Sequence, residues 1–507
     1  MPSIVLATLN ARYAHASLGL RYLRANMGEL RDETEIREFV IRTPAAQIVE
    51  RLVALQPRVI GFGVYIWNVQ QTTRVIELLK AAAPQVAIVV GGPEVSHEVE
   101  RQAICRLADQ VVTGWGDVTF ARLARQLLHG PRVLTRVHAG EQPPLAEIAL
   151  PYAEYSDEDL RHRHIYVEAS RGCPFKCEFC LSALDRTAWP FPLDQFLQEL
   201  ETLWQRGARR YKFVDRTFNL RVEASAAILD FFLRRIERSP DDPPFLHFEL
   251  VPDHLPAVLR GRLARFPAGT LQLEIGIQTF NVEVQTLISR RQKNEAAEAN
   301  LRWLRAETNA HLHVDLIAGL PGEDLASLAA GFDRLVALRP HEIQLGVLKR
   351  LRGAPIARHA ERHALLFSAE APYEVISTGL IDAPTMERIR RFARYWDLIA
   401  NSGRFPRTLP LLLGRAPFDR FMALTDWLYA TTQRTHALQN EELYAQLRAW
   451  LVHGGMVADE ATRLLALDYS DSGARGRLPF LAATPVRRGA RTARGATLDR
   501  QRRHLRA

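Results

Sequence analysis

Residues 171–183 read Arg171-Gly172-Cys173-Pro174-Phe175-Lys176-Cys177-Glu178-Phe179-Cys180-Leu181-Ser182-Ala183 and contain three of the four cysteines in a chain of 507 residues. The spacing is C-x3-C-x2-C, so three thiolates can surround one face of a small metal cluster. Three thiols cannot form two disulfides, and they do not complete a closed four-ligand zinc site. A [4Fe–4S] cluster held by three thiolates keeps one iron open for the amine and carboxylate of a small molecule.

The cysteine motif directly follows a predicted strand, Ile165–Ser170, and has an aromatic residue, Phe179, before its last cysteine. In this context it resembles the signature of the radical SAM superfamily, whose open iron binds S-adenosylmethionine (SAM). The resemblance implies that Cys173, Cys177 and Cys180 hold a [4Fe–4S] cluster and that Phe179 contacts SAM. The alternatives are incidental cysteines, or a zinc site completed by a histidine elsewhere in the chain.

The bulk composition is that of a chain with large apolar cores and several domains. Hydrophobic residues make up 47% and charged residues 24% of the sequence, and its length predicts about two to four domains. The chain starts with a strand-like segment rather than a signal peptide, and no apolar run approaches the ~18 residues that span a bilayer. Clustered cysteines indicate a reducing compartment, so we expect a cytoplasmic protein without a membrane partner. Cys105, in a predicted helix, is expected to be a small buried apolar residue.

The net charge of +9 comes from one end of the chain. Residues 474–507 contain ten arginines, no lysine and one acid, which leaves 56 basic and 56 acidic residues elsewhere (66 less 10, and 57 less 1). The body therefore gives no electrostatic indication of a nucleic-acid partner. The tail is expected to be a solvated basic segment. Its other interpretations are a docking surface for an acidic partner or RNA, or docking of Arg502-Arg503-His504 near the cofactor.

Residues 1–130 are predicted to form a doubly wound domain, an open parallel sheet with helices on both faces. Its strands are expected at Ile4–Leu9, Ile36–Val40, Val59–Tyr65, Val86–Val90 and Gln110–Thr113. Its helices are expected at Leu18–Met27, Ala45–Leu55, Val69–Ala82, Glu98–Leu107 and Thr119–Leu128. Ligands of such sheets bind beyond the carboxyl ends of the strands.

The loops at those strand ends carry glycines and aromatic residues. With Ser17–Leu23 before them and the cysteine motif after them, they resemble the cobalamin-binding (B12-binding) domain fused to many radical SAM proteins. The resemblance implies a set of cobalamin contacts: Asn10, His15, Tyr65, Trp67, Gly91, Gly92, Pro93, Glu94, Gly114 and Gly116. In the last loop, Trp115 and Asp117 replace the acids of the usual pattern. A G-x-G-x-x-G motif is absent after the first strand, so a dinucleotide is a weak alternative.

His15 occupies the loop from which a cobalt ligand would come. The D-x-H-x-x-G motif that supplies this ligand in other cobalamin proteins is absent from the sequence, and the resemblance implies cobalamin without a protein ligand to cobalt. His15 is therefore either an ordinary hydrogen-bonding loop residue or a ligand in its own right. A doubly wound domain that has lost its cofactor and serves as a lid is the alternative for the whole domain.

Residues 131–160, which are rich in proline, are expected to be an extended linker. Residues 161–358 again alternate strands and helices, which predicts a partial (β/α)6 TIM-like barrel with its site at the strand carboxyl ends. The six strands are expected at Ile165–Ser170, Arg210–Val214, Phe245–Leu250, Leu271–Ile277, His311–Ala318 and Glu342–Leu348.

Polar residues at the barrel's strand ends match the radical SAM pattern of SAM contacts. A sulfonium ion that bears an amino acid and a ribose needs a few carboxylates and amides in a largely apolar barrel. The resemblance implies these roles for Asp215, Glu249, Glu274, Gln278 and Pro321. For Glu249 or Glu274 taken alone, a packing salt bridge is the alternative.

Residues 359–473 lose the strand rhythm, and apolar residues recur at helical spacing, as in Met386, Ile389, Phe392 and Trp396. We expect an α-helical C-terminal domain followed by the Arg-rich tail, 474–507. This region resembles an uncharacterised extension in one subset of radical SAM proteins, and it is a candidate cap for the barrel mouth.

The resemblance implies a radical SAM enzyme that cleaves SAM reductively and uses cobalamin for methyl transfer to an unactivated carbon. An external electron donor such as flavodoxin or ferredoxin is implied, and the substrate, a small molecule or a peptide, is not identified. A cobalamin-dependent rearrangement or cyclisation, a radical SAM enzyme without cobalamin, and an RNA-binding or RNA-modifying protein are the alternatives. Methylthiotransferases are disfavoured because they need a second cysteine trio, and Cys105 stands alone.

Overall fold

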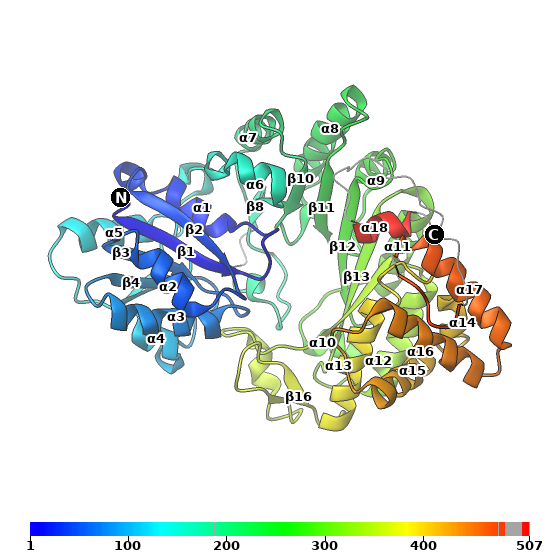
Figure 1. Ribbon diagram of the computed structural model, residues 1–507. Helices are drawn as coiled ribbons and strands as arrows, with labels where there is room; N and C mark the ends of the chain where they lie inside the picture. Colours follow the sequence, from blue (N-terminus) through cyan, green and yellow to red (C-terminus); the bar gives the residue numbers. More distant parts are fainter. Residues whose placement is uncertain (186–187, 475, 482–498, 506–507) are drawn as a thin grey trace. The chain divides into compact units, whose positions relative to one another are not determined.

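The computed structural model describes residues 1–185, 188–474, 476–481 and 499–505 (Figure 1). They form two compact units. The first comprises Met1–Arg216 with Lys349–Ala357 and Ser368–Glu374, and the second comprises Thr217–Leu348, Arg358–Phe367 and Val375 to the C-terminus. The sequence interpretation of a doubly wound domain, a partial barrel and a helical region is confirmed.

The first unit begins with a parallel sheet of order β2-β1-β3-β4-β5-β6. Its strands are β1 (Ile4–Asn10), β2 (Thr34–Val40), β3 (Val59–Gly63), β4 (Ala87–Gly91), β5 (Gln110–Thr113) and β6 (Val137–Ala139). Five of these were predicted, whereas β6 lies in the segment expected to be a linker. It was missed because three residues, Val137-His138-Ala139, are too short a run for alternation to indicate a strand.

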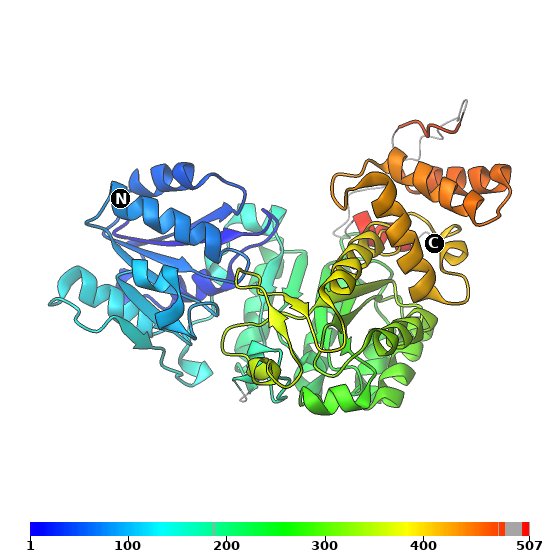
Figure 2. The same ribbon diagram turned by 90° about the horizontal axis from the view of Figure 1, so that it is seen from below.

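Helices cover both faces of this sheet (Figures 1 and 2). One face carries α2 (Ala45–Val53), α3 (Val69–Ala82) and α4 (Ala103–Leu107), and the other carries α1 (Leu18–Ala25) and α5 (Thr119–His129). Successive strand residues point to opposite faces. Val5, Ala7 and Leu9 of β1 therefore join one core, and Ile4 and Leu6 join the other.

The helix expected at Glu98–Leu107 is broken into two pieces. A 3-10 turn, η2 (Val99–Arg101), precedes α4, and Gln102 between them has an extended backbone. The side chain of Gln102 donates to the carbonyl oxygens of Glu94 and His97 instead of facing solvent. Cys105 is fully buried in α4, as expected for a small apolar residue.

The first unit continues with the opening elements of the second sheet. These are α6 (Asp157–His162), β7 (Ile165–Val167), α7 (Leu193–Gln205) and β10 (Arg210–Phe213), and β7 pairs in parallel with β10. A short antiparallel pair, β8 (Ser170–Arg171) with β9 (Trp189–Pro190), closes the base of the cysteine loop. Pro192 occupies the N-cap of α7.

A buried guanidinium joins three elements of the first unit. Arg21 of α1 lies 2.9 Å from Glu38 of β2 and 2.8 Å from Asp159 of α6. Burial opposes the charge of Arg21, but Glu38 and Asp159 outweigh it and raise the pKa of the guanidinium. Two carboxylates around one guanidinium satisfy donors that could not be left unpaired in the interior.

Two returning segments of the chain pack on the loop after β4. Arg352 Nε lies 3.0 Å from Glu94 Oε1, and the Tyr373 hydroxyl donates to the same carboxylate at 2.7 Å. Arg350 Nη2 lies 2.6 Å from Glu98 Oε1 at a more exposed position. Glu94, expected to contact cobalamin, is buried with Arg352 and Tyr373 as its partners.

The second unit holds four parallel strands, β11 (Phe245–Leu250), β12 (Leu271–Gln278), β13 (His311–Ala318) and β14 (Glu342–Val347). The connecting helices are α8 (Val222–Arg238), α9 (Ala257–Leu263), α10 (Val282–Leu287), α11 (Asn294–Glu307) and α12 (Leu325–Ala337). These four strands lie in the order β14-β13-β12-β11. Pro256 occupies the N-cap of α9.

The helical region follows as α13 (Ala383–Leu398), α14 (Leu409–Leu413), α15 (Pro417–Thr432), α16 (Asn440–His453), α17 (Ala458–Asp471) and α18 (Asp499–His504). Its core is aromatic, as the predicted stripe indicated. Phe392 and Trp396 of α13 pack against Phe418 and Phe421 of α15 and against Phe332 of α12. Within the described ranges, every helix is too short or too polar to cross a membrane.

We expect Arg352→Ala to lower the free energy of unfolding of the first unit by about 3 kcal/mol, because it leaves the buried Glu94 carboxylate without its guanidinium. Arg350→Ala is the matched control. It removes a partly exposed ion pair with Glu98 and should cost about 0.5–1 kcal/mol. Urea unfolding of both variants measures the two values, and equal losses would contradict this account of Glu94.

Candidate functional site

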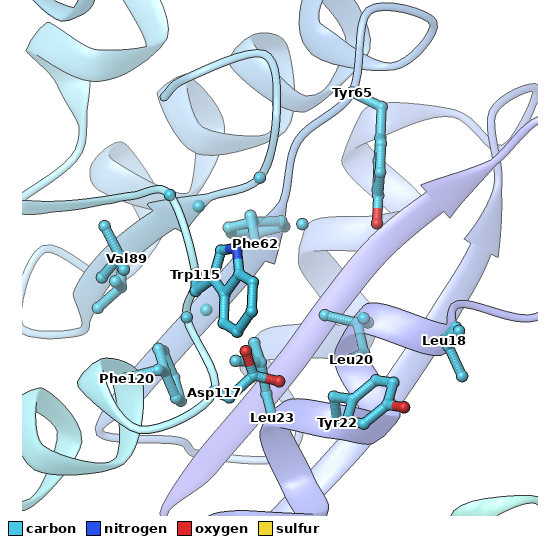
Figure 3. A pocket seen from close by; sticks show the side chains of 18 of the residues that line it. Leu18, Leu20, Tyr22, Leu23, Phe62, Tyr65, Val89, Trp115, Asp117 and Phe120 are labelled. Carbon is cyan, nitrogen blue, oxygen red and sulfur yellow. The ribbon is translucent and has the colours of Figure 1, made fainter. Parts of the chain in front are cut away.

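A cavity of about 320 Å³ lies in the first unit between the sheet and the helices α1 and α5 (Figure 3). On this face the buried strand residues near the amino ends are large, such as Leu6, Val59 and Val89. Towards the carboxyl ends, glycines replace them at Gly61, Gly63 and Gly91 of β3 and β4 and at Gly114 after β5. Missing side chains at the strand ends therefore create the cavity.

The glycines are needed for space or for backbone conformation. A Cβ on Gly61 would lie 2.8 Å from the ring of Phe120, and one on Gly116 would lie 3.1 Å from Leu23. Gly114 has a φ of +71° and open space beside it, a conformation that side chains disfavour. The remaining walls are mostly apolar and include Leu20 and Phe120.

A second buried guanidinium connects the cavity to the cysteine loop. Arg171 lines the cavity, lies 2.9 Å from Asp117 and 2.7 Å from Glu168, and immediately precedes Gly172 and Cys173. Its guanidinium also lies 4.7 Å from the ring centres of Tyr22 and Trp115. Burial opposes its charge, but Glu168 and Asp117 outweigh burial and raise its pKa.

Five of the ten residues expected to contact cobalamin line the cavity: Tyr65, Gly91, Gly92, Gly114 and Gly116. The other five are not part of its lining: Asn10, His15, Trp67, Pro93 and Glu94. Trp67 is half exposed and stacks on Tyr65 with 4.4 Å between the ring centres. Asn10 donates to Glu38 and to the carbonyl of His15.

His15 is engaged by the opening strand of the second sheet. Its Nδ1 lies 2.6 Å from the hydroxyl of Tyr166 in β7. Burial lowers the pKa of His15, and Lys212 and Arg12 lower it further. This contact supports the hydrogen-bonding interpretation, and its role as a cobalt ligand stays a prediction.

Sequence reasoning missed several lining residues. Gly61 and Gly63 could have been found, since glycine at alternating positions of a buried strand signals a close approach or a gap. Glu168, Arg171 and Phe120 carry no such signal. Their place depends on how the segment before the cysteines packs against the doubly wound domain.

The cysteine loop is held at both ends by backbone hydrogen bonds. The amide of Cys173 donates to the carbonyl of Asp185 at 2.8 Å, and the amide of Cys180 donates to the carbonyl of Cys177 at 3.1 Å. The carbonyl of Glu178 accepts from Ile356 at 2.9 Å. Gly172 has a φ of +93°, which turns the chain from β8 into the loop.

The three thiols interact electrostatically. Burial raises the pKa of Cys173 to about 11, and Cys180 and Cys177 contribute to the rise. Cys173 is buried while the other two are partly exposed, and none of the three is in a disulfide. A bound cluster would instead lower the pKa of the thiols, because its iron is positive and coordinating thiols are deprotonated.

Asp215, expected to contact SAM, fixes the segment before the cysteines. Its carboxylate accepts from the amide of Ala169 at 3.0 Å and from the hydroxyl of Ser170 at 2.6 Å. Burial raises its pKa to about 7, although the bonds from Ser170 and Ala169 oppose the rise. These contacts make Asp215 a positioning residue for the loop, and direct SAM contact stays a prediction.

The other expected SAM residues belong to the second unit, except Phe179 in the cysteine loop. Glu249 and Glu274 are paired neighbours on β11 and β12, and His247 lies 2.9 Å from Glu274. Gln278 ends β12 with a φ of +68°, and its amide lies where a Cβ on Gly276 would be. Pro321 lies in the turn after β13.

Most of the Arg-rich tail lies outside the described residues, so its predicted solvation and its RNA interpretation stay predictions. The described part, α18, docks in the second unit. Arg503 donates to the carbonyl of Ser402, and His504 to the carbonyl of Asn401. His504 also faces His311 at the amino end of β13. This contact lies at the opposite end of β13 from Pro321, an expected SAM contact, and docking of Arg502-Arg503-His504 near the cofactor stays a prediction.

Asp215→Asn should change how stability depends on pH. An aspartate ionises near pH 4 when unfolded, but Asp215 ionises near pH 7 in the fold. Its contribution therefore destabilises the fold progressively from about pH 4 to pH 7 and is constant above that range. Between pH 5 and 7, the free energy of unfolding of Asp215→Asn should rise relative to that of the wild type by on the order of 1 kcal/mol per pH unit.

Urea unfolding of the metal-free protein at several pH values measures this difference. Asp194→Asn, on the exposed first turn of α7, is the matched control. A constant difference between wild type and Asp215→Asn across the range would contradict the assignment.

Three family models match the chain one after another. The B12 binding domain matches residues 4–124, the radical SAM superfamily matches residues 167–334, and a protein family of unknown function, DUF4080, matches residues 361–504. The first match contains every residue that lines the cavity except Glu168 and Arg171, which lie in the second match together with the cysteine loop.

Two curated relatives are similar over part of the chain. The 2-(S-pantetheinyl)-carbapenam-3-carboxylate methyltransferase of Streptantibioticus cattleyicolor is 24% identical over 332 residues, which are 59% of this chain and 48% of that protein. The cobalamin-dependent radical SAM methyltransferase TokK of Streptomyces tokunonensis is 23% identical over 343 residues, 60% of this chain and 49% of that protein. The chain thus spans about half the length of the curated relatives it matches.

Among solved structures, the cobalamin-dependent SAM radical enzyme OxsB with aqua-cobalamin bound has the same fold. Its TM-score is 0.61 at 14% identity, and the match covers 93% of this chain and 84% of that chain. TsrM from Kitasatospora setae is similar with a TM-score of 0.55 at 18% identity, over 72% of this chain and 77% of that chain. The resemblance to B12-dependent radical SAM proteins is confirmed: the chain consists of a B12-binding domain, a radical SAM domain and a C-terminal DUF4080 domain.

Proposed function

We propose that this protein is a cobalamin-dependent radical SAM enzyme that transfers a methyl group to an unactivated carbon of its substrate. One observation carries the proposal. Arg171 borders both the cavity of the B12-binding domain and the cysteine loop, so one packed unit contains the places for both cofactors. The B12-binding and radical SAM domains imply cobalamin, a [4Fe–4S] cluster and SAM.

The cavity fits a part of cobalamin. At about 320 Å³ it is too small for a whole corrinoid, but its size and apolar walls suit the nucleotide tail with its aromatic base. The corrin ring would then lie at the mouth, beyond the strand carboxyl ends. None of the described residues that line the cavity is a histidine or a cysteine. A protein ligand to cobalt would therefore have to come from outside the cavity lining, where His15 is the candidate from the sequence.

The cysteine loop fits the cluster. The loop closed by β8 and β9 carries Cys173, Cys177 and Cys180, none of which is in a disulfide. When bound, the cluster supplies the electron for SAM cleavage and cobalamin supplies the methyl group. The chain's own residues then orient the cofactors and exclude water. Asp215 fixes the segment before the cysteine loop, and Arg171 fixes the start of the loop against the B12-binding domain.

Clustered thiols, two of them partly exposed, persist in reduced form only in a reducing environment. We therefore place the protein in the cytoplasm, with flavodoxin or ferredoxin as the class of electron donor. The cobalamin-dependent rearrangement or cyclisation uses the same cofactors, and product analysis distinguishes it from methylation. The relatives named above are methyltransferases, which favours methyl transfer.

Cys177→Ala should abolish reductive SAM cleavage and remove most of the cluster iron. Two thiolates are too few to hold a [4Fe–4S] cluster whose fourth iron has no protein ligand. Anaerobic assays of 5′-deoxyadenosine and iron content measure both effects. Cys105→Ala, which alters the buried cysteine of α4, is the control and should keep its iron. Full 5′-deoxyadenosine production by Cys177→Ala would contradict the proposal.

Gly91→Val should lower corrinoid affinity at least tenfold, a loss of about 1.4 kcal/mol or more in binding free energy. A Cβ on Gly91 has no neighbour closer than 3.5 Å, so the strand tolerates it, but the valine methyl groups would occupy the cavity. The corrinoid absorbance of reconstituted protein measures binding. Gly261→Ala in α9, where a Cβ meets open space, is the control.

The same variant separates the two radical SAM hypotheses. Cluster iron and SAM cleavage should persist in Gly91→Val while methylation is lost. Undiminished corrinoid binding by Gly91→Val would show that the cavity is not the cobalamin site. If the wild type supplied with cobalamin contains no corrinoid, this result would favour a radical SAM enzyme that works without cobalamin.

A further inference from the structure

Polar side chains occupy one face of the four strands in the second unit. Side chains of a strand alternate between faces, and paired residues of β12, β13 and β14 share a face. At the amino ends of these strands the face presents Gln272, His311, His313 and Glu342. These residues lie at the opposite strand ends from Glu249, Gln278 and Pro321, and the proposed function gives them no role.

The terminal helix α18 covers this polar end (Figure 1). Gln501 hydrogen-bonds to Gln272, and Arg500 Nη2 lies 2.9 Å from Glu342 Oε2. The ring of His504 lies 5.1 Å from that of His311 between their centres. A helix of six residues is held here by side chains that are themselves buried in the second unit.

Three side chains in this contact have the composition of a metal site. One ligand atom from each of His311, Glu342 and His504 lies within 4.8 Å of the others. Two imidazoles and one carboxylate are a recurrent ligand set for zinc and other divalent transition ions, with a further position for water. His311 and Glu342 are buried, and His504 is half-buried.

The outer contacts orient these ligands as metal sites require. The Nε2 of His504 donates to the carbonyl of Asn401 at 3.0 Å, which leaves the lone pair on Nδ1. Asn401 is fixed by two 2.9 Å hydrogen bonds to the backbone of Ile343, next to Glu342. Arg500 binds Glu342 Oε2 and leaves Oε1 for an ion. Such outer hydrogen bonds fix the tautomer and direction of metal ligands.

The nearby charges also admit a dication. Arg500 is balanced by Glu342 and by Asp397, whose Oδ1 lies 2.7 Å from Arg500. Arg404 also interacts with Asp397, so these two carboxylates and two guanidinium groups carry no net charge without an ion. His341 is not a competing ligand through Nδ1, because that atom accepts from the amide of Leu312 at 2.9 Å.

We propose that His311, Glu342 and His504 bind a divalent transition-metal ion of the zinc type, and that this ion fastens α18 to the amino ends of β13 and β14. The Glu342–His311 hydrogen bond, 2.9 Å between Oε1 and Nε2, is then replaced by two bonds to the ion. Two ligands come from the barrel, and the third is the last residue of the DUF4080 match. The site is structural and separate from the cofactor cavity of the first unit.

The test uses the full chain with its iron–sulfur cluster reconstituted and Zn²⁺ as the probe. After dialysis, we expect about one zinc per chain by elemental analysis, in addition to cluster iron. X-ray absorption at the zinc edge should show only nitrogen and oxygen neighbours. His311→Ala and His504→Ala should each weaken zinc binding at least tenfold.

Two variants serve as controls for the assignment of zinc to these three ligands. His453→Ala, in α16 where the ring stacks on Trp427, should keep full zinc binding. Cys177→Ala should also keep it, which separates this site from the cysteine loop. Glu342→Gln preserves the shape beside Arg500 but removes the anionic ligand, so it should lose zinc even if His311→Ala fails to fold.

A sulfur neighbour in the zinc spectrum would overturn the proposal, and so would equal zinc binding by wild type, Glu342→Gln and His504→Ala. Wild-type protein without zinc after dialysis would also overturn it and would assign the same residues to a purely hydrogen-bonded contact. Each of these outcomes leaves the corrinoid and SAM measurements unaffected.

Discussion

The buried guanidinium of Arg171 is the interaction on which the first unit's site depends. Its pairs with Asp117 and Glu168 join the last loop of the doubly wound domain to the strand that leads into the cysteines. Removing Arg171 would leave these two buried carboxylates without their guanidinium, which costs far more than an exposed pair returns. The cavity wall and the cluster loop are therefore fixed by one set of charges.

The cavity itself follows from what the strands lack. Large residues near the amino ends of β3 and β4 give way to Gly61, Gly63 and Gly91 near the carboxyl ends, while α1 and α5 continue above them. Helices cannot sink into the gap because their own Leu20 and Phe120 already pack on the sheet. A ligand site at the strand carboxyl ends thus arises from packing alone, at the position where open parallel sheets bind ligands.

Local pattern was enough to predict the fold class and the cysteine loop. Alternating apolar runs indicated both parallel sheets, and the spacing of Cys173, Cys177 and Cys180 is visible within one short segment. The site residues were harder, since their roles depend on partners far away in the chain. Glu94 pairs with Arg352, 258 residues later, and Asp215 fixes Ser170, 45 residues earlier. Neither partner is visible in the short segment around each carboxylate.

The amino ends of β12–β14 show the same dependence on distant contacts. A (β/α) barrel normally fills its interior with branched apolar residues, but here His311, His313 and Glu342 occupy one strand face. Polar groups removed from water need partners, and residues from the far end of the chain supply them through Arg500, Gln501 and His504. The polar strand ends and α18, which lies at the end of the DUF4080 match, are therefore complementary, because each supplies polar partners to the other.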